Sequence, residues 1–209
     1  MSALAPTDDG TRAASRTPSL APSLHEALRA DTAAAHASLE RDLDWEARVG
    51  TREGYRGLLA RLYGFHAAYE PAIGAALGDE AFLSPRRRLD AAARDLAHLG
   101  ATPAAVAALP APAPVALSGP AAAMGALYVL EGSTLGGAVI GRTVSRLHGF
   151  APETGLAYYA GRGRATGPLW IAFRARLEAI AADATARAAT RDAANATFDA
   201  MRLWLCAAP

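Results

Sequence analysis

A histidine and two charged neighbours form the grouping in this sequence with the clearest chemical potential. His36 lies four residues before Glu40 and seven after Arg29, so an α-helix would place all three on one face. A carboxylate bound to one imidazole nitrogen fixes the tautomer and leaves the other nitrogen free to bind a metal. A cation two helical turns away, roughly 10 Å, suits an elongated ligand with a central metal and an anionic edge, which is the layout of haem. Taken singly, each residue is also explained as a solvated charge or a hydrogen-bonded core histidine.

A cluster of glycines interrupts a long apolar helical pattern over residues 128–141. The glycines are Gly132, Gly136, Gly137 and Gly141. Each glycine inside a helix costs roughly 0.5–1 kcal/mol relative to alanine, so such a cluster requires a reason. A bare helix face lets a ligand lie almost on the backbone, and it equally lets a second helix pack closely. The glycine stretch by itself leaves these two explanations open.

The other histidines have simpler explanations. His25 falls in a first helical turn, whereas His98 and His148 lie near helix ends before a glycine, where a donor side chain helps to satisfy the last carbonyl groups. His66 is a second interior candidate, and an interior histidine is most often a hydrogen-bonded core residue.

Motifs of other metal, hydrolytic and nucleotide sites are missing from the sequence. It has no HExxH, paired ExxH or CxxC motif, and residues 132–136 read G-S-T-L-G rather than the GxSxG of a nucleophile elbow. Residues 161–164 match part of a phosphate loop but follow no predicted strand. The arginine run at 86–88 has no aromatic stripe beside it, so a nucleic-acid surface is not expected.

Composition and periodicity predict one all-α domain at residues 23–209, with about seven helices, after a disordered tail at 1–22. Hydrophobic residues make up 52% of the chain, largely through alanine, and the formal net charge is +1. No apolar run reaches the roughly 20 residues of a membrane helix. The single cysteine, Cys206, suits a reducing cytoplasm. We therefore expect a soluble cytoplasmic protein without membrane or nucleic-acid partners.

Some boundaries of the helices can also be predicted. Ser23, Thr51 and Thr190 are expected to be N-caps, the first with Glu26 in a capping box. Pro71 is expected to end or kink its helix. A brief extended segment is expected at residues 156–159.

Two stretches give the chain a resemblance to a known family. They are LRADTAAAHASLE at residues 28–40 and LYVLEGSTLGG at residues 127–137. Weaker support comes from residues 64–65, 169–174, 197–198 and 204–205. On these residues the chain resembles the haem oxygenases, in particular the bacterial type found beside bacterial phytochromes. The resemblance covers nearly all of residues 24–206.

The resemblance implies a haem-oxygenase-like helical bundle with haem between a proximal histidine helix and a kinked, glycine-rich distal helix. His36 matches the iron ligand, and Glu40 matches the carboxylate that orients it. The residues that match the distal wall are Gly132, Ser133, Gly136 and Gly137. The residues that match contacts to the haem propionates or the pocket wall are Arg29, Tyr128, Arg174 and Phe198.

Two positions depart from patterns within the family. Ser133 stands where animal enzymes have an aspartate that anchors distal waters, although bacterial relatives share the serine. Trp170 stands where some relatives carry a propionate-binding lysine. The distal waters would then be held by Arg142 or by backbone groups, and the position of ring opening is left unassigned.

The implied reaction is the oxidative cleavage of haem b to biliverdin, with release of carbon monoxide and ferrous iron. It would use O2 and electrons from a ferredoxin or reductase, and a bacterial phytochrome would be a candidate receiver of biliverdin. A bare distal helix suits this reaction because it confines the oxygen without strong proton donors. The alternatives are a haem-binding carrier or sensor without turnover, and a helical scaffold that uses its glycines only for packing.

Overall fold

Helices dominate residues 23–207, which are the residues that the computed structural model describes, the side chains of Thr134 and Leu135 excepted. The elements are α1 Leu24–Asp31, α2 Ala33–Leu43, α3 Trp45–Val49, α4 Arg52–Leu77, α5 Glu80–Leu83, η1 Ser84–Arg86, α6 Leu89–His98, α7 Pro103–Ala107, α8 Pro120–His148, η2 Gly163–Ala165, α9 Thr166–Ile180 and α10 Ala184–Cys206. No strand occurs within residues 23–207, which agrees with the all-α prediction. The tail expected at residues 1–22 lies outside the described residues.

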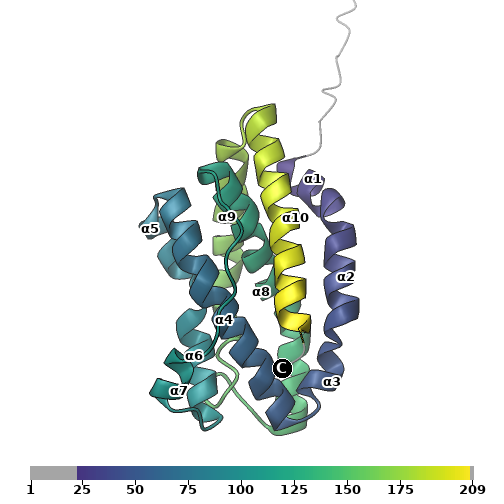
Figure 1. Ribbon diagram of the computed structural model, residues 1–209, viewed down its shortest axis with the longest axis vertical. Coiled ribbons are helices and arrows are strands. Elements are labelled where there is room, and N and C mark those ends of the chain that lie inside the picture. Colours follow the sequence, from purple (N-terminus) through teal and green to yellow (C-terminus); the bar gives the residue numbers. More distant parts are fainter. Residues whose placement is uncertain (1–22, 208–209) are drawn as a thin grey trace, which may run out of the picture.

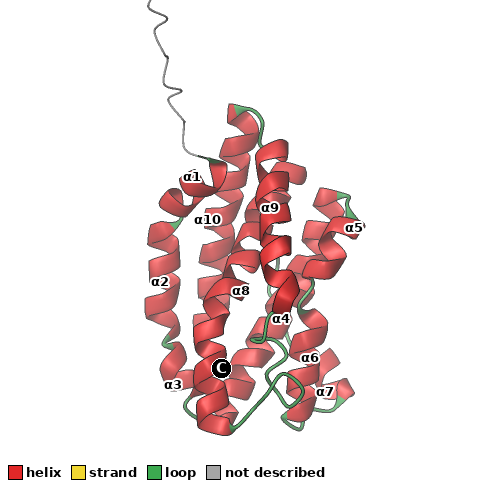
Figure 2. Ribbon diagram, turned by 180° about the vertical axis from the view of Figure 1, so that it is seen from behind, coloured by secondary structure: helices red, strands yellow, loops and turns green. Residues whose placement is uncertain are grey.

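Three long helices, α4, α8 and α10, form the centre of an elongated bundle (Figure 1). Helix α8 packs against both α10 and α4, and α10 also packs against α2. Helices α1, α2 and α3 lie on one side of this centre and α5, α6 and α7 on the other, as the views from front and back agree (Figures 1 and 2). Helix α9 packs against α8 of the centre and against α1.

The first half of α8 is a core helix. Every residue from 122 to 131 is buried. The closest approach to α10 is at Gly125, where an added Cβ would lie 2.1 Å from the carbonyl oxygen of Thr190. The Thr190 hydroxyl donates to the carbonyl oxygens of Ala121 and Ala186, at 3.0 and 2.8 Å. These contacts fix the position of α8 along α10.

Helix starts follow the prediction at Ser23 and Thr51 but not at Thr190. Ser23 forms its capping box with Glu26, and Thr51 accepts a hydrogen bond from the third residue of α4. The prediction for Thr190 is wrong, because α10 begins seven residues earlier, after Asp183. The Asp183 carboxylate accepts from the amide of residue 186 at 2.8 Å, and its charge suits a helix N-terminus.

Helix α4 does not end at Pro71 but continues to Leu77, so of the two effects expected of this exposed proline the helix end does not occur. A further segment differs from the prediction. Residues 156–159 form turns rather than an extended segment. Their backbone is held instead by Asp95, whose two carboxylate oxygens each accept from an amide, of Ala157 and Tyr158, at 2.8 Å.

The helical segments outnumber the seven or so expected because α3, α5 and α7 are short connectors and because one predicted helix is interrupted at Thr32. The Thr32 hydroxyl donates to the carbonyl oxygen of Leu28 at 2.7 Å, and the turn there separates α1 from α2. The interruption lies between Arg29 and His36, so the two residues occupy successive helices.

Helix α8 is long and apolar enough to cross a membrane by length and composition, which the sequence analysis did not expect. Its most apolar stretch has a mean hydropathy of 1.3. However, 56% of that stretch is buried inside the protein, which is the pattern of a core helix.

We predict that Gly125→Ala lowers the free energy of unfolding by about 1–3 kcal/mol, because the new methyl group must displace α8 from the α10 backbone. Gly57→Ala is the matched control. Gly57 is exposed on α4 with nothing within 4 Å of an added Cβ, so alanine should be neutral or stabilise by up to about 1 kcal/mol. Urea unfolding measures both variants, and equal changes would contradict the close approach.

Candidate functional site

An elongated cleft lies between α1–α2 and α8. Its larger part has a volume of about 410 Å³ and is lined from α1 and α2 over residues 25–39, from α8 over residues 128–133, and by Trp170 of α9 and Phe198 and Met201 of α10. A second part of about 290 Å³ continues toward α3 and has a mainly apolar lining. The two parts share His36, Leu39, Ser133 and Met201. Each part is of the size of a small-ligand pocket.

His36 faces this cleft from α2. Its Nδ1 lies 3.4 Å from Glu40 Oε2, one helical turn on, and its side chain is 53% exposed. The Phe198 ring stands nearly perpendicular to the imidazole, with the ring centroids 5.6 Å apart. No other polar partner of His36 occurs among the described residues. The arrangement therefore leaves Nε2 available to a ligand in the cleft.

The glycines of α8 divide into two groups. Gly132 and Gly136 line the cleft, and an added Cβ on either would meet nothing within 4 Å. An added Cβ on Gly137 would lie 3.0 Å from the ring of Tyr159, and one on Gly141 would lie 3.1 Å from Tyr159 Cβ. Gly132 and Gly136 therefore leave open space that a ligand could occupy, whereas Gly137 and Gly141 are packed closely, against a loop tyrosine rather than a second helix.

Ser133 and Tyr158 provide polar atoms beside the bare face of α8. The Ser133 hydroxyl donates to the carbonyl oxygen of Leu130 at 2.7 Å, so its oxygen is left to accept hydrogen bonds. The Tyr158 phenol lines the second part of the cleft and lies 2.9 Å from His66 Nε2. Burial raises the pKa of Tyr158 to about 12, against the opposing field of Arg88. Tyr158 is therefore protonated at neutral pH.

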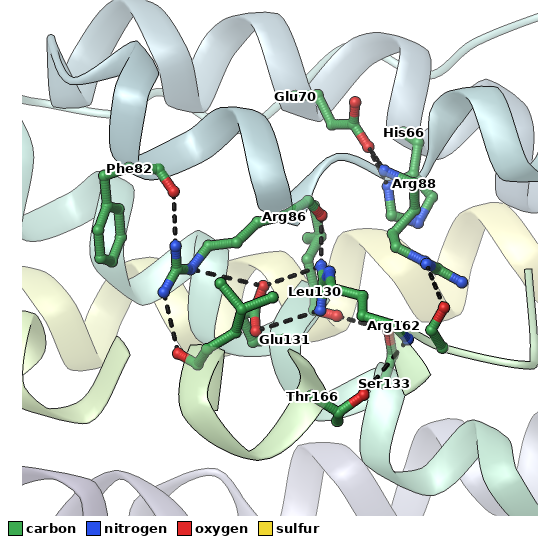
Figure 3. A network of polar contacts seen from close by, with 12 residues as sticks. His66, Glu70, Phe82, Arg86, Arg88, Leu130, Glu131, Ser133, Arg162 and Thr166 are labelled. Carbon is green, nitrogen blue, oxygen red and sulfur yellow. Dashed lines mark hydrogen bonds and ion pairs between the residues drawn. The ribbon is translucent and has the colours of Figure 1, made fainter. Parts of the chain in front are cut away.

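A buried hydrogen-bond chain runs from Tyr158 to His66 and on to Glu70; Figure 3 shows its second link, between His66 and Glu70. His66 Nδ1 lies 2.9 Å from Glu70 Oε1, which also accepts from the amides of Arg88 and Leu89 at 2.6 and 3.2 Å. Burial acts to raise the pKa of Glu70, but the hydrogen bonds from His66 and the two amides lower it overall. His66 is thus the hydrogen-bonded core residue that its position predicted.

Glu131, the residue before Gly132, is buried between two arginines (Figure 3). Its Oε1 lies 3.1 Å from Arg162 Nη2 and 3.8 Å from Arg86 Nε. Burial raises the pKa of Glu131, although Arg162 and Arg86 both act to lower it. Arg162 also donates to the carbonyl oxygen of Arg86, so α8, η1 and the loop after α8 are joined at one point.

Positive charge collects at the α1 end of the cleft. We call the residues gathered there the cationic end; they are His25, Arg29, Tyr128, Trp170 and Arg174. All but Arg174 line the cleft. Burial, and after it the charges of Arg174 and Arg29, lowers the pKa of His25, which shows that both arginines lie close to it. Within residues 23–207 neither arginine makes an ion pair, so both are available to an anion.

Comparison with known proteins places this geometry in a family. The family model described as heme oxygenase matches residues 22–206. The chain belongs to the haem oxygenase family. A solved structure of the NO- and CO-bound heme oxygenase from Neisseria meningitidis is 27% identical, with a TM-score of 0.72 over 88% of this chain and 91% of that one. Heme oxygenase from Leptospira interrogans, 16% identical, matches in fold, with a TM-score of 0.73 over 88% and 99%. No curated protein sequence matches this chain.

Membership of the haem oxygenase family confirms the predicted fold class and activity. The protein is an oxidoreductase that degrades haem to biliverdin, and haem is its substrate. The cleft fits that substrate in its chemistry, because it combines an imidazole nitrogen without a partner, a helix face without side chains and a cationic end. Haem correspondingly presents an iron, a flat apolar ring and two carboxylates.

Every residue that the sequence analysis predicted for the site lies in or beside the cleft, but among the further lining residues it did not single out His25 and Tyr158. The sequence analysis explains His25 as a first-turn residue, whereas the structure places it on the cleft wall. Its spacing of four residues from Arg29 was the signal that could have identified it. Tyr158 gave no such signal, because it lies in irregular structure that Asp95 holds from a distant helix.

We predict that Glu131→Gln lowers the free energy of unfolding by about 3 kcal/mol, because Arg86 and Arg162 would remain buried without their counter-charge. Glu80→Gln is the control, since Glu80 pairs with Arg87 at the surface and such pairs contribute roughly 1 kcal/mol or less. Denaturant unfolding of both variants provides the measurement. If Glu131→Gln lowers the free energy of unfolding no more than Glu80→Gln does, the ion pairs of Glu131 with Arg86 and Arg162 do not hold α8 in place.

Proposed function

We propose that this enzyme holds haem b between His36 and the bare face of α8 and cleaves it to biliverdin, carbon monoxide and ferrous iron. One observation carries the proposal: His36 of α2 and the unobstructed Gly132 and Gly136 of α8 line the same cleft. A flat ligand bound by the imidazole would lie against helix backbone on its other face.

The proximal residues fix how the ligand is bound. His36 is proposed to bind the iron through Nε2, with Glu40 keeping the proton on Nδ1. Phe198 limits rotation of the imidazole because its ring stands across it at 77°. Together these contacts set the tautomer and the plane of the ligating ring.

The distal residues control space and hydrogen bonding over the ring. Gly132 and Gly136 give close backbone confinement without a side chain that could bind iron strongly. Ser133 offers a hydrogen-bond acceptor, and so does the Tyr158 oxygen, because the Tyr158 proton is directed to His66 Nε2. We propose that these two hydroxyl groups bind the distal water that an aspartate holds in animal relatives. Gly137 contributes by letting Tyr159 pack against α8.

The cationic end is proposed to receive the two haem propionates. Arg29, Arg174 and Tyr128 are the residues that we assign to them. Because cations occur at one end of the cleft and mainly apolar side chains at the other, this placement determines which edge of the ring lies at which end. The bound haem supplies both the iron that activates O2 and the carbon skeleton that is cleaved.

The reaction also needs electrons from outside the chain. We propose that a ferredoxin or a reductase supplies them, in the cytoplasm, and that a bacterial phytochrome is a suitable receiver of the product. The single free thiol, Cys206, is compatible with a reducing compartment.

The direct test is an absorption spectrum of the purified protein with one equivalent of hemin, followed under air after addition of ascorbate or a ferredoxin system. We expect a sharp Soret band that decays while a broad red biliverdin band grows. A stable Soret band would indicate a haem carrier or sensor. If no Soret band appears beyond that of free hemin, the protein does not bind haem, and the glycines of α8 would serve helix packing alone.

We predict that His36→Ala abolishes turnover and weakens hemin binding by at least roughly tenfold. Loss of a residue that only orients a metal-binding side chain already lowers metal affinity or activity by about this factor, so loss of the metal-binding side chain itself should cost at least as much. His98→Ala is the control, because His98 is exposed at the end of α6 and does not line the cleft. Spectral titration with hemin measures both. A wild-type spectrum in the His36 variant would rule out the assignment.

We predict that Gly136→Leu lowers the turnover rate by about 100-fold or more with little change in stability, because its side chain enters open space in the cleft and displaces the ring. Gly57→Leu controls for placing leucine at an exposed helical glycine. Single-turnover rates and thermal unfolding are compared for both. Unchanged turnover in Gly136→Leu would mean that haem does not lie against this face.

A further inference from the structure

Within the cationic end, His25 alone has a side chain that titrates near neutral pH. It is held there by three helices. His25 belongs to α1. The centroid of its ring lies 5.3 Å from the ring centroid of Trp170 on α9, with an interplanar angle of 83°, and 6.2 Å from the ring centroid of Tyr128 on α8. The start of α1 is tied to α9 as well, since the amide of Leu24 donates to Glu178 at 2.5 Å. His25 therefore occupies a fixed position on the cleft wall.

The charged groups facing His25 come from α1 and α9, and the neutral phenol of Tyr128 faces it from α8. The two carboxylates are engaged elsewhere. Glu26 accepts from the amide and hydroxyl of the N-cap serine at 2.9 and 3.0 Å. Glu178 accepts from the α1 amide and lies 3.8 Å from Arg187. The unpaired Arg29 and Arg174 therefore dominate the field at the ring.

This field makes the charge of His25 sensitive to an arriving anion. Without one, burial and then the two arginines favour the neutral imidazole, so the pKa of His25 is lowered. Two carboxylates placed at the cationic end would offset the charges of the arginines and attract a proton to the ring. At a pH between its pKa in the free protein and its pKa in the complex, the same side chain would then be neutral in the one and cationic in the other.

We propose that His25 takes up a proton when the haem carboxylates enter the cationic end, and so becomes the third cation that holds them. The inference rests on the proposed function of this cleft. It makes His25 a residue that couples haem affinity to pH, because a proton bound only in the complex stabilises the complex more as the pH falls. The proton comes from solvent, and His25 returns it when the carboxylates leave.

The first test compares hemin affinity between pH 6 and pH 8.5 in the wild-type protein and in His25→Gln. A difference of one pKa unit between free and bound protein corresponds to a tenfold change in affinity, so we expect the wild type to gain roughly three- to tenfold at low pH relative to the variant. Both proteins keep His36 and its neighbours, so the comparison isolates the effect of position 25. Identical pH dependence in the two proteins would overturn the proposal.

Hemin dimethyl ester is the matched control ligand, since it keeps the iron and ring but lacks carboxylates. With this ligand the two proteins should show the same pH dependence. A persistent advantage of the wild type with the ester would mean that His25 acts through the ring or the iron and not through the carboxylates, which would also overturn the proposal.

The second test follows the proton itself in the wild-type protein, with no dependence on activity or on folding of a variant. Ring-labelled histidines are titrated by NMR in the free protein and in its complex with zinc protoporphyrin IX, with His98 as an internal reference. We expect the midpoint of His25 to rise in the complex and that of His98 to stay. An unchanged or lower midpoint of His25 would contradict the proposal, whereas failure of hemin to bind the wild type would remove the proposed function itself.

Discussion

Glu131 is buried where α8 changes from a core helix to a wall of the cleft. Its carboxylate contacts Arg162 and Arg86, and Arg86 also donates to the carbonyl oxygens of Phe82 and Leu169, at 2.6 and 2.9 Å. A buried charge cluster adds little net stability, but losing one member costs much, so it favours one arrangement over others. Here the favoured arrangement fixes the backbone next to Gly132, and the distal wall depends on it.

A bare helix face creates a cleft only if its walls are supported from behind. Helix α8 is supported by α10 at Gly125 and by Tyr159 at Gly137, two close contacts that side chains would prevent. On the other side, α2 packs against α10, and α1 is bonded to α9 through Glu178. The glycines thus lower the stability of the α8 helix, but they provide both the open space of the cleft and the close contacts that support its wall.

The parts of this site that local spacing controls could be predicted from the sequence. His36 and Glu40 meet because they are one helical turn apart, and the apolar stretch around Gly132 predicted a buried helix. The parts that depend on distant contacts could not be predicted. Thr190 has the residue type of an N-cap, yet its hydroxyl bridges α8 and α10, and Tyr158 reaches the cleft only because a loop is held by a distant carboxylate.

The central claim is that haem lies between His36 and the bare face of α8, and a crystal structure of the hemin complex tests it most directly. The account predicts iron bound by His36 Nε2, the ring against the backbone at Gly132 and Gly136, and the propionates toward Arg29 at the cationic end. Iron bound by another side chain that lines the cleft, such as His25 or Met201, would contradict it, as would hemin bound outside the cleft.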